Sequence, residues 1–421
     1  MKTISFILPS RDNLPYLKQA YNSIRKHLGY VHEVVMLDDA SSDGTWEWMN
    51  EIEKQDVNVK IHRNDGPNRV GHTVLYDVGV QLSTNEIFSI FHADMIATPN
   101  YVNNMIKHLD RGKVISSTRI EPPLHPPGPE KIIRNFGLGT DEFDDDGFQK
   151  LVIEQEELNK DKTTNGIFAP WMMYKEDFEA IGGHDPLFAP MELEDSDIFN
   201  RFHLKGYELI QSRDSYCYHM TCRGSRFKDG LEIEKEIPLP DGTIWYKPKD
   251  SEEYTKLRQQ KFREWHRKWG SDVLHDENMM PRVLPKYDIG FVVENCTMDL
   301  LYVLEPWCST IYTNTWGWKQ YLEEEQKNTS IDLKDRVKSK MDNEPDNDII
   351  VEFDAKEFTQ EQFSIINKLS EILSNDEQLE VGEFDLGIFK VTINKLKTYE
   401  ETLINCKDRK MEDKWKKYYQ I

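Results

Sequence analysis

The sequence predicts an α/β fold, in which an N-terminal domain built on a mostly parallel sheet precedes a second, α+β domain. The first indication is an alternation of continuous apolar runs with segments of helical apolar spacing, from residue 4 to about residue 120. Such runs are typical of parallel strands buried on both faces, and the alternation implies a doubly wound sheet with right-handed crossovers. The second indication is that strand-like runs start again after Pro285.

The expected elements of the first domain follow in close succession. Residues 14–28 have helical apolar spacing, and "SSDGTWEWMNEI" begins with the Ser and Asp residues that favour a helix start. Residues 121–147 are rich in prolines and acidic residues, which predicts an exposed loop. The other expected strands are "ISFILP", "EVVML", "VNVKIH", "EIFSIF" and "SYCYHM"; further helices are expected at "VGHTVLYDVGVQL", after "IFAPWMMY" and in "ELEDSDIFNRF".

We expect three parts: a first domain at 1–247, a helical connector at 248–284 and a C-terminal α+β domain at 285–421. The connector contains the basic sequence "YTKLRQQKFREWHRKW", which suits an amphipathic helix packed on the first domain or a face for an anionic partner. The C-terminal domain is compatible with self-association into a homo-oligomer or with binding another partner. Its expected strands are "YDIGFVV", "LLYVL", "DIIVEF" and "LGIFKVTI", and its expected helix is "QEQFSIINKLSEIL".

Composition excludes several classes of protein. The net charge of −22 disfavours binding to nucleic acid or to anionic membranes, because like charges repel. The sequence has no apolar stretch of about 18 residues, so we expect no transmembrane segment. The start "MKTISFILPS" reads as a strand and not as a signal peptide. The five cysteines are sparse and predict reduced thiols, hence a cytoplasmic location.

Polar residues gather where the expected strands end, which is the edge at which parallel α/β sheets bind ligands. These residues are Pro9 to Arg11, Asp38 to Ser41 and His92 to Asp94. Burying Asp94 at a strand end is unfavourable unless it is paired or bound to metal, and its oxygen ligands suit Mg²⁺ or Mn²⁺. Because strand side chains alternate, His92 points to the same side as Asp94. It could be a Mn²⁺ ligand, a ribose contact or a structural histidine.

Two pairs of acidic residues can be interpreted as having either a structural role or a functional role. Asp38 and Asp39 could be two solvated acids before a helix capped by Ser41 or Asp43, or they could accept hydrogen bonds from a nucleoside. Glu194 and Asp195 open an expected helix, where capping is the bland reading. A catalytic base works best with a pKa near the working pH, so burial and neighbouring acids would have to raise the pKa of Asp195.

In order and spacing, several segments resemble the inverting glycosyltransferases of family 2 with the GT-A fold. The resemblance covers residues 1–230 and leaves the C-terminal third without a counterpart. The segments that carry it are "SFILPSRDNLPYLKQAYNSI", "EVVMLDDASSDGT", "VGHTVLYDVGV", "HADMIATPNYV", "GGHDPLFAPMELEDSDIFNRFHLKGYEL" and "YHMTCRGS".

The resemblance implies a nucleotide site lined by Pro9, Ser10 and Arg11, with Asp39 contacting a uracil. Arg69, in the loop before the third helix, could contact the diphosphate or be an ordinary surface arginine. Arg223 and Arg226 could likewise contact the diphosphate or be ordinary surface arginines.

The resemblance also implies a metal site. The family's Asp-x-Asp signature falls on "HAD", so Asp94 matches the metal-binding acid while His92 replaces the first acid. This replacement removes one negative charge and leaves the metal affinity and the nucleotide open. His219 matches a histidine that completes the metal or diphosphate site.

The resemblance further implies the catalytic groups. Asp195 is implied as the general base and Glu194 as a group that orients the acceptor. Trp171 suits either an acceptor platform or the core.

We therefore expect a Mn²⁺- or Mg²⁺-dependent transferase that moves a sugar from a nucleotide-sugar, UDP-sugar by resemblance, to a glycan or other hydroxyl acceptor with inversion. Asp195 would take the proton of the acceptor hydroxyl as it attacks the anomeric carbon. Two alternatives remain: a non-catalytic module that binds nucleotide-sugar or glycan, which the histidine at position 92 favours, and a transferase that glycosylates modified nucleic-acid bases. The charge of the chain argues against the second alternative.

Overall fold

The computed structural model describes residues 2–221, 230–240, 242–375 and 379–420. The chain forms two compact units. The first unit comprises residues 1–256, 275–281 and 405–421, and the second comprises residues 257–274 and 282–404. No helix in the described part of the chain is both long and apolar enough to cross a membrane.

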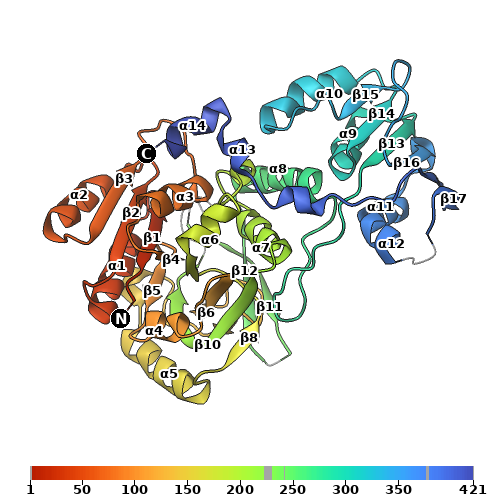
Figure 1. Ribbon diagram of the computed structural model, residues 1–421. Helices are drawn as coiled ribbons and strands as arrows, with labels where there is room; N and C mark the ends of the chain where they lie inside the picture. The colour runs from red at the N-terminus through yellow and green to blue at the C-terminus, as the bar shows by residue number, and fades with distance from the viewer. Residues whose placement is uncertain (1, 222–229, 241, 376–378, 421) are drawn as a thin grey trace. The chain divides into compact units, whose positions relative to one another are not determined.

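The first unit is centred on a ten-stranded mixed sheet (Figure 1). Its strands are β1 (Ser5–Ser10), β2 (Glu33–Asp38), β3 (Val59–Arg63), β4 (Ile87–Ile90), β5 (Met95–Ala97), β6 (Lys113–Glu121), β7 (Lys131–Ile133), β8 (Thr163–Asn165), β9 (Trp171–Tyr174) and β10 (Glu208–His219). Their order is β3-β2-β1-β4-β9-β6-β10-β5, with β7 beside β6 and β8 beside β10. The mostly parallel α/β sheet is confirmed; β9, β5 and β8 run antiparallel to their neighbours.

Helices cover both faces of this sheet. Phe6 and Leu8 of β1 belong to the same buried cluster as Leu17 of α1. Ile7 points to the other face, where α3 comes so close that a Cβ on its Gly79 would lie 2.4 Å from the Ile7 side chain. The helices are α1 (Leu14–Leu28), α2 (Thr45–Gln55), α3 (His72–Leu82), α4 (Tyr101–Ile106), α5 (Asp145–Leu158), α6 (Lys175–Ala180) and α7 (Glu194–Leu204); a hairpin of β11 (Ile233–Pro238) and β12 (Ile244–Pro248) follows.

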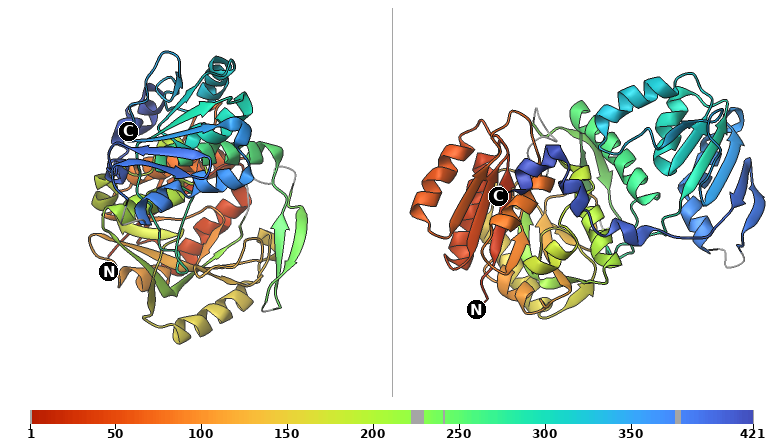
Figure 2. Two further views of the ribbon diagram at one scale, coloured as in Figure 1. Left: turned by 90° about the vertical axis from the view of Figure 1, so that its right-hand side faces the viewer. Right: turned by 45° about the horizontal axis from the view of Figure 1, so that its top comes forward.

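The last residues of the chain return to the first unit, although the expected boundaries grouped them with the C-terminal domain. The short helices α13 (Lys407–Lys410) and α14 (Asp413–Tyr419) lie near α3, and the right-hand view of Figure 2 shows the same return in dark blue. Lys410 forms an ion pair with the buried Asp77 of α3, and Arg409 forms one with Asp185 at 2.8 Å. These contacts tie residues 405–421 to the layer that carries α3 and α7.

Arg409→Ala is expected to lower the free energy of unfolding by about 2–3 kcal/mol, because breaking a buried ion pair leaves a carboxylate with less compensation. Asp185 is 1 % exposed. The matched control is Lys414→Ala in the same segment, whose pair with Glu412 is exposed and is expected to contribute less than about 1 kcal/mol. Urea denaturation of both variants measures the difference, and equal effects would contradict the expectation.

The second unit has its own sheet, of order β15-β14-β13-β16-β18-β17. The expected strand "LLYVL" is wrong: these residues lie in a helix, α9, whose first turn is capped by the hydroxyl of Thr297. A short apolar run does not distinguish a strand from a buried helix, and here the cap at Thr297 favours the helix. The elements are β13 (Ile289–Glu294), α9 (Met298–Leu304), β14 (Thr310–Thr313), α10 (Trp318–Glu325), β15 (Val337–Ser339), β16 (Ile349–Asp354), α11 (Gln360–Asn367), α12 (Leu369–Asn375), β17 (Gly382–Leu386) and β18 (Phe389–Ile393).

The basic helix expected near residues 250–270 is α8 (Glu252–Trp269). From Leu257 onward it belongs to the second unit. The guanidinium of Arg267 is buried and pairs with Glu305 at 2.7 Å and with Glu325 at 2.8 Å. At least one basic residue of α8 is therefore paired with acids inside the second unit.

Candidate active site

A cavity of about 340 Å³ opens in the first unit at the carboxyl ends of β1, β2, β4 and β10. This is the edge at which the sequence gathers its polar residues. Nine of the site residues expected from the sequence line the cavity, whereas Glu194 lies next to Asp195 at the start of α7 and does not. The expected residues that line it are Pro9, Ser10, Arg11, Asp39, Arg69, His92, Asp94, Asp195 and His219.

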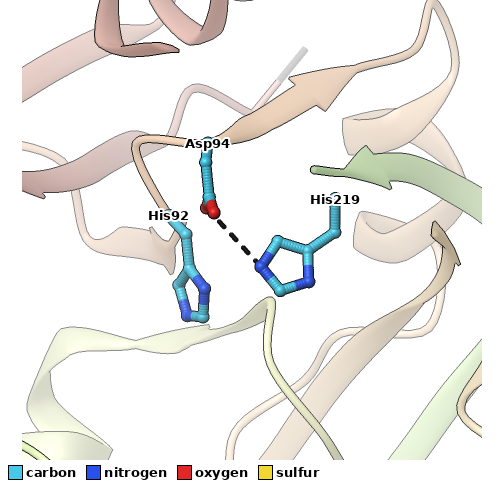
Figure 3. Close-up of side chains that lie close together, drawn as sticks. All are labelled: His92, Asp94 and His219. Atoms are coloured by element: carbon cyan, nitrogen blue, oxygen red, sulfur yellow. Dashed lines mark ion pairs between the residues drawn. The ribbon is translucent and has the colours of Figure 1, made fainter. Parts of the chain in front are cut away.

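Three of these side chains converge into a group that could hold a metal ion. His92 and Asp94 come from the turn after β4, and His219 is the last residue of β10 (Figure 3). One ligand atom from each of the three lies within 4.8 Å of the others. His219 Nε2 lies 3.5 Å from Asp94 Oδ1. The histidine that replaces the family's first acid is therefore part of the group.

The charge states of His92 and Asp94 suit a divalent cation, whereas Asp94 and Glu121 outweigh burial and raise the pKa of His219, so a cation would have to displace a proton from this ring. Burial, aided by the nearby His219, lowers the pKa of His92 to about 3, so its ring is neutral and can donate a lone pair. Burial alone would raise the pKa of Asp94, but His219 outweighs it and lowers this pKa to about 2. Two imidazoles and one carboxylate are ligands that Mn²⁺ accepts readily, whereas Mg²⁺ prefers oxygen.

The two acids at the start of α7 have opposite environments. Glu194 Oε1 lies 2.5 Å from His72 Nε2, and although burial opposes its charge, the pairing with His72 lowers the pKa of Glu194. Asp195 faces the cavity, and burial together with the negative charge of Glu194 raises its pKa to about 7. Two neighbouring carboxyl groups whose pKa values are pushed apart are typical of catalytic sites.

A strained turn sets the direction of these acids. Glu192 and Leu193, just before α7, have φ angles of +83° and +66°, a region that non-glycine residues rarely adopt. The hydroxyl of Tyr254 donates a hydrogen bond to Glu192. Gly71, at the start of α3, makes room for this segment, since a Cβ there would lie 1.8 Å from the carbonyl oxygen of Pro190.

Asp39 holds the loop that leads into α3. Its Oδ1 accepts hydrogen bonds from Val70 N at 3.0 Å and from Asn64 Nδ2 at 2.8 Å, and its Oδ2 accepts one from Gly71 N at 2.8 Å. Arg69 forms an ion pair with it at 3.6 Å. A carboxylate has about four acceptor positions, so Asp39 can take about one further donor from the cavity. Asp39 is buried, so it is not a solvated acid, and its contact with a nucleoside stays a prediction.

The sequence missed several residues that line the cavity: His72, Tyr76, Arg119, His125, Phe168 and Tyr254. Arg119 could have been found by the rule that identified His92 and Asp94, because it precedes the carboxyl end of β6 by two residues. No strand-end pattern in the sequence pointed to His72 or Tyr254. Trp171 is fully buried among Phe88, Phe178 and Phe202, so it is a core residue. Arg223 and Arg226 lie outside the described residues.

Comparison with known proteins shows what the first unit resembles. Residues 5–180 match the family model described as glycosyl transferase family 2. Among solved structures, GalNAc-T7 with UDP, GalNAc and Mn²⁺ is 18 % identical, with a TM-score of 0.41, over 52 % of this chain and 44 % of that one. The mannosyltransferase PcManGT from Pyrobaculum calidifontis, in complex with GDP-Man and Mn²⁺, is 18 % identical, with a TM-score of 0.38, over 52 % of this chain and 57 % of that one.

In both comparisons, this chain spans less than two thirds of the solved chain. The family match covers the strands and helices that deliver Pro9, Asp39, His72 and Asp94 to the cavity. Residues 5–180 are therefore similar to a glycosyl transferase family 2 domain.

Proposed function

We propose that the protein transfers a sugar from a nucleotide-sugar donor to a hydroxyl group of an acceptor, with inversion at the anomeric carbon. The observation that carries the proposal is that one cavity is lined both by the group His92, Asp94 and His219 and by Asp195. A donor diphosphate held at the first site would place the anomeric carbon within the same enclosed space as the acid. Proximity of this kind supplies a large share of the rate in transfer reactions.

The three-residue group is proposed to hold a divalent cation, with neutral His92 and His219 and ionised Asp94 as its ligands. When bound, such a cation neutralises charge that develops on the departing diphosphate. Arg11 and Arg69 line the same cavity and are proposed to contact the nucleotide and its phosphates. Asp39 keeps its proposed contact with a uracil N3–H through its remaining acceptor position, which makes UDP the proposed donor nucleotide.

Asp195 is proposed to be the general base. A pKa near 7 lets it be ionised at neutral pH and still bind the proton that the acceptor hydroxyl loses. Glu194 is proposed to act behind it: paired with His72, it stays ionised, and its charge keeps the pKa of Asp195 high. This differs from the acceptor-orienting role that the resemblance implies, because Glu194 does not line the cavity.

Calorimetry followed by a turnover assay tests the function. The purified protein is titrated with UDP, GDP and their hexose conjugates, with and without Mn²⁺, and each donor that binds is then assayed for hydrolysis and transfer. We expect cation-dependent binding of a uridine diphosphate-sugar and release of the nucleotide. Binding without turnover of any donor would favour the non-catalytic module.

Mn²⁺ is expected to support at least about tenfold more activity than Mg²⁺, because imidazole nitrogen is a better ligand for Mn²⁺ than for Mg²⁺. The measurement is the initial rate of nucleotide release by metal-depleted protein, as each cation is titrated back. Equal rates at saturation with the two cations would contradict the proposed ligand set.

A further inference from the structure

Glu121 is the last residue of β6 and lies directly behind the proposed metal group. β6 and β10 run parallel and pair Ile120 with Tyr218, so the next residue on each strand, Glu121 and His219, are neighbours. Glu121 is completely buried, with 0 % of its surface exposed. A buried carboxylate is unfavourable unless hydrogen bonds and cations compensate it.

The compensation comes from donors on several segments. Glu121 Oε2 lies 3.2 Å from His219 Nδ1, and Glu121 Oε1 lies 2.8 Å from the ammonium of Lys131. Arg119 Nε lies 3.6 Å from Oε2, and His125 Nδ1 lies 3.4 Å from Oε1. The acid is therefore held in place from β6, β7, β10 and the segment that follows β6.

The contact with His219 has a chemical consequence. An imidazole has two nitrogens, and the partner of one decides which of them can bind a metal. Nδ1 of His219 faces Glu121, whereas Nε2 faces Asp94 at 3.5 Å. A carboxylate that accepts from the far nitrogen of a metal-bound histidine fixes both the tautomer and the orientation of the ring.

We propose that Glu121 is a positioning residue of this glycosyltransferase: it holds the His219 ring, keeps a proton on Nδ1 and thereby presents Nε2 to the cation beside Asp94. This inference rests on the proposed metal site. It assigns a role to a side chain that does not line the cavity.

The chain offers a matched control for this role. Glu130 is also buried and pairs with the same two cations, Arg119 at 3.2 Å and Lys131 at 3.2 Å. Among the described residues, its ion pairs are with these two cations and not with His92, Asp94 or His219. Glu121→Gln and Glu130→Gln therefore each remove one negative charge from the same cluster, but Glu121→Gln also alters the partner of His219.

The test is a Mn²⁺ titration of the whole protein without donor, followed by electron paramagnetic resonance. Glu121→Gln is expected to weaken Mn²⁺ binding by about 10–100-fold, the usual effect of losing such a partner. Glu130→Gln is expected to stay within about threefold of the wild-type protein, because the ligand ring keeps its partner. Thermal melting of each variant verifies that it is folded.

The outcomes separate this inference from the proposed function. A wild-type protein that fails to bind Mn²⁺ would refute the metal site itself. Wild-type binding that is unchanged in Glu121→Gln, or equally weakened in Glu130→Gln, would refute the positioning role and leave the metal site standing.

A second measurement reads the tautomer of His219 in the wild-type protein itself. Histidine-selective ¹⁵N spectra are recorded with the diamagnetic ion Zn²⁺ bound, and His219 is assigned by its loss in His219→Gln. A protonated Nδ1 and a metal-bound Nε2 are expected. The reverse tautomer would overturn the inference.

Discussion

Asp195→Asn is expected to lower the rate of sugar transfer by about 10²–10⁴-fold, the range that a positioned general base contributes. The amide keeps the shape of the side chain but cannot accept the proton of the acceptor hydroxyl. Binding of Mn²⁺ and donor is expected to stay close to wild type, because neither proposed site uses this carboxylate. Steady-state transfer assays at saturating donor measure the loss. Activity within a few-fold of wild type would remove Asp195 from the proposed role.

The same variant is expected to be more stable than the wild-type protein above pH 7, which separates lost chemistry from misfolding. Burial and Glu194 raise the folded-state pKa of Asp195 from 3.8 to about 7. The folded protein therefore binds this proton more tightly than the unfolded chain, and the associated stability is present at low pH and lost as pH rises through about 7. At pH 8 the ionised side chain opposes folding, and asparagine removes this effect.

The expected gain at pH 8 is about 1–3 kcal/mol, since one pKa unit corresponds to about 1.4 kcal/mol and part of the charge is screened. Urea denaturation at pH 8 and pH 5 measures it, and the gain is expected to shrink at pH 5. In the wild-type enzyme, kcat is expected to fall as pH drops below about 7, as the base becomes protonated. A rate that is flat from pH 5 to pH 8 would contradict the assignment.

Asp94→Ala is expected to abolish measurable Mn²⁺ binding and to lower transfer by about 10³-fold or more. The carboxylate is the charged member of the proposed ligand set, and a metal clamp is worth several kcal/mol in the transition state. Calorimetry with Mn²⁺ and the transfer assay are run on Asp94→Ala and Asp195→Asn side by side. The first variant is expected to lose metal and activity, and the second to lose activity alone. Mn²⁺ binding that survives in Asp94→Ala would contradict the ligand set.

Strand ends are what made this cavity predictable from sequence. Apolar runs that finish at Ser10, Asp38 and just before His92 bring their following residues to one edge, whatever the details of packing. The alternation rule placed His92 and Asp94 on one side, and the structure brings both beside His219. Local pattern was sufficient here because each residue sits at a fixed position relative to a strand.

Residues whose place depends on tertiary packing could not be predicted in this way. His72 reaches Glu194 across 122 positions of sequence, and Tyr254 reaches Glu192 from a helix with no expected part in the cavity. Their partners are set by loop geometry, including the strained turn at Glu192 and Leu193. The segment "LLYVL" failed for a related reason: its length and apolar character fit both a strand and a helix, and a threonine cap decided.

The return of residues 405–421 to the first unit makes the unit that holds the cavity discontinuous in sequence. A recombinant fragment that stops at residue 256 would contain every residue around the cavity and still lack Arg409 and Lys410, the cations that meet Asp185 and Asp77. Truncating the chain at residue 256 is therefore a poor way to isolate the first unit. A minimal version of this unit is better designed by excising both segments of the second unit, 257–274 and 282–404, and joining the cut ends with flexible linkers.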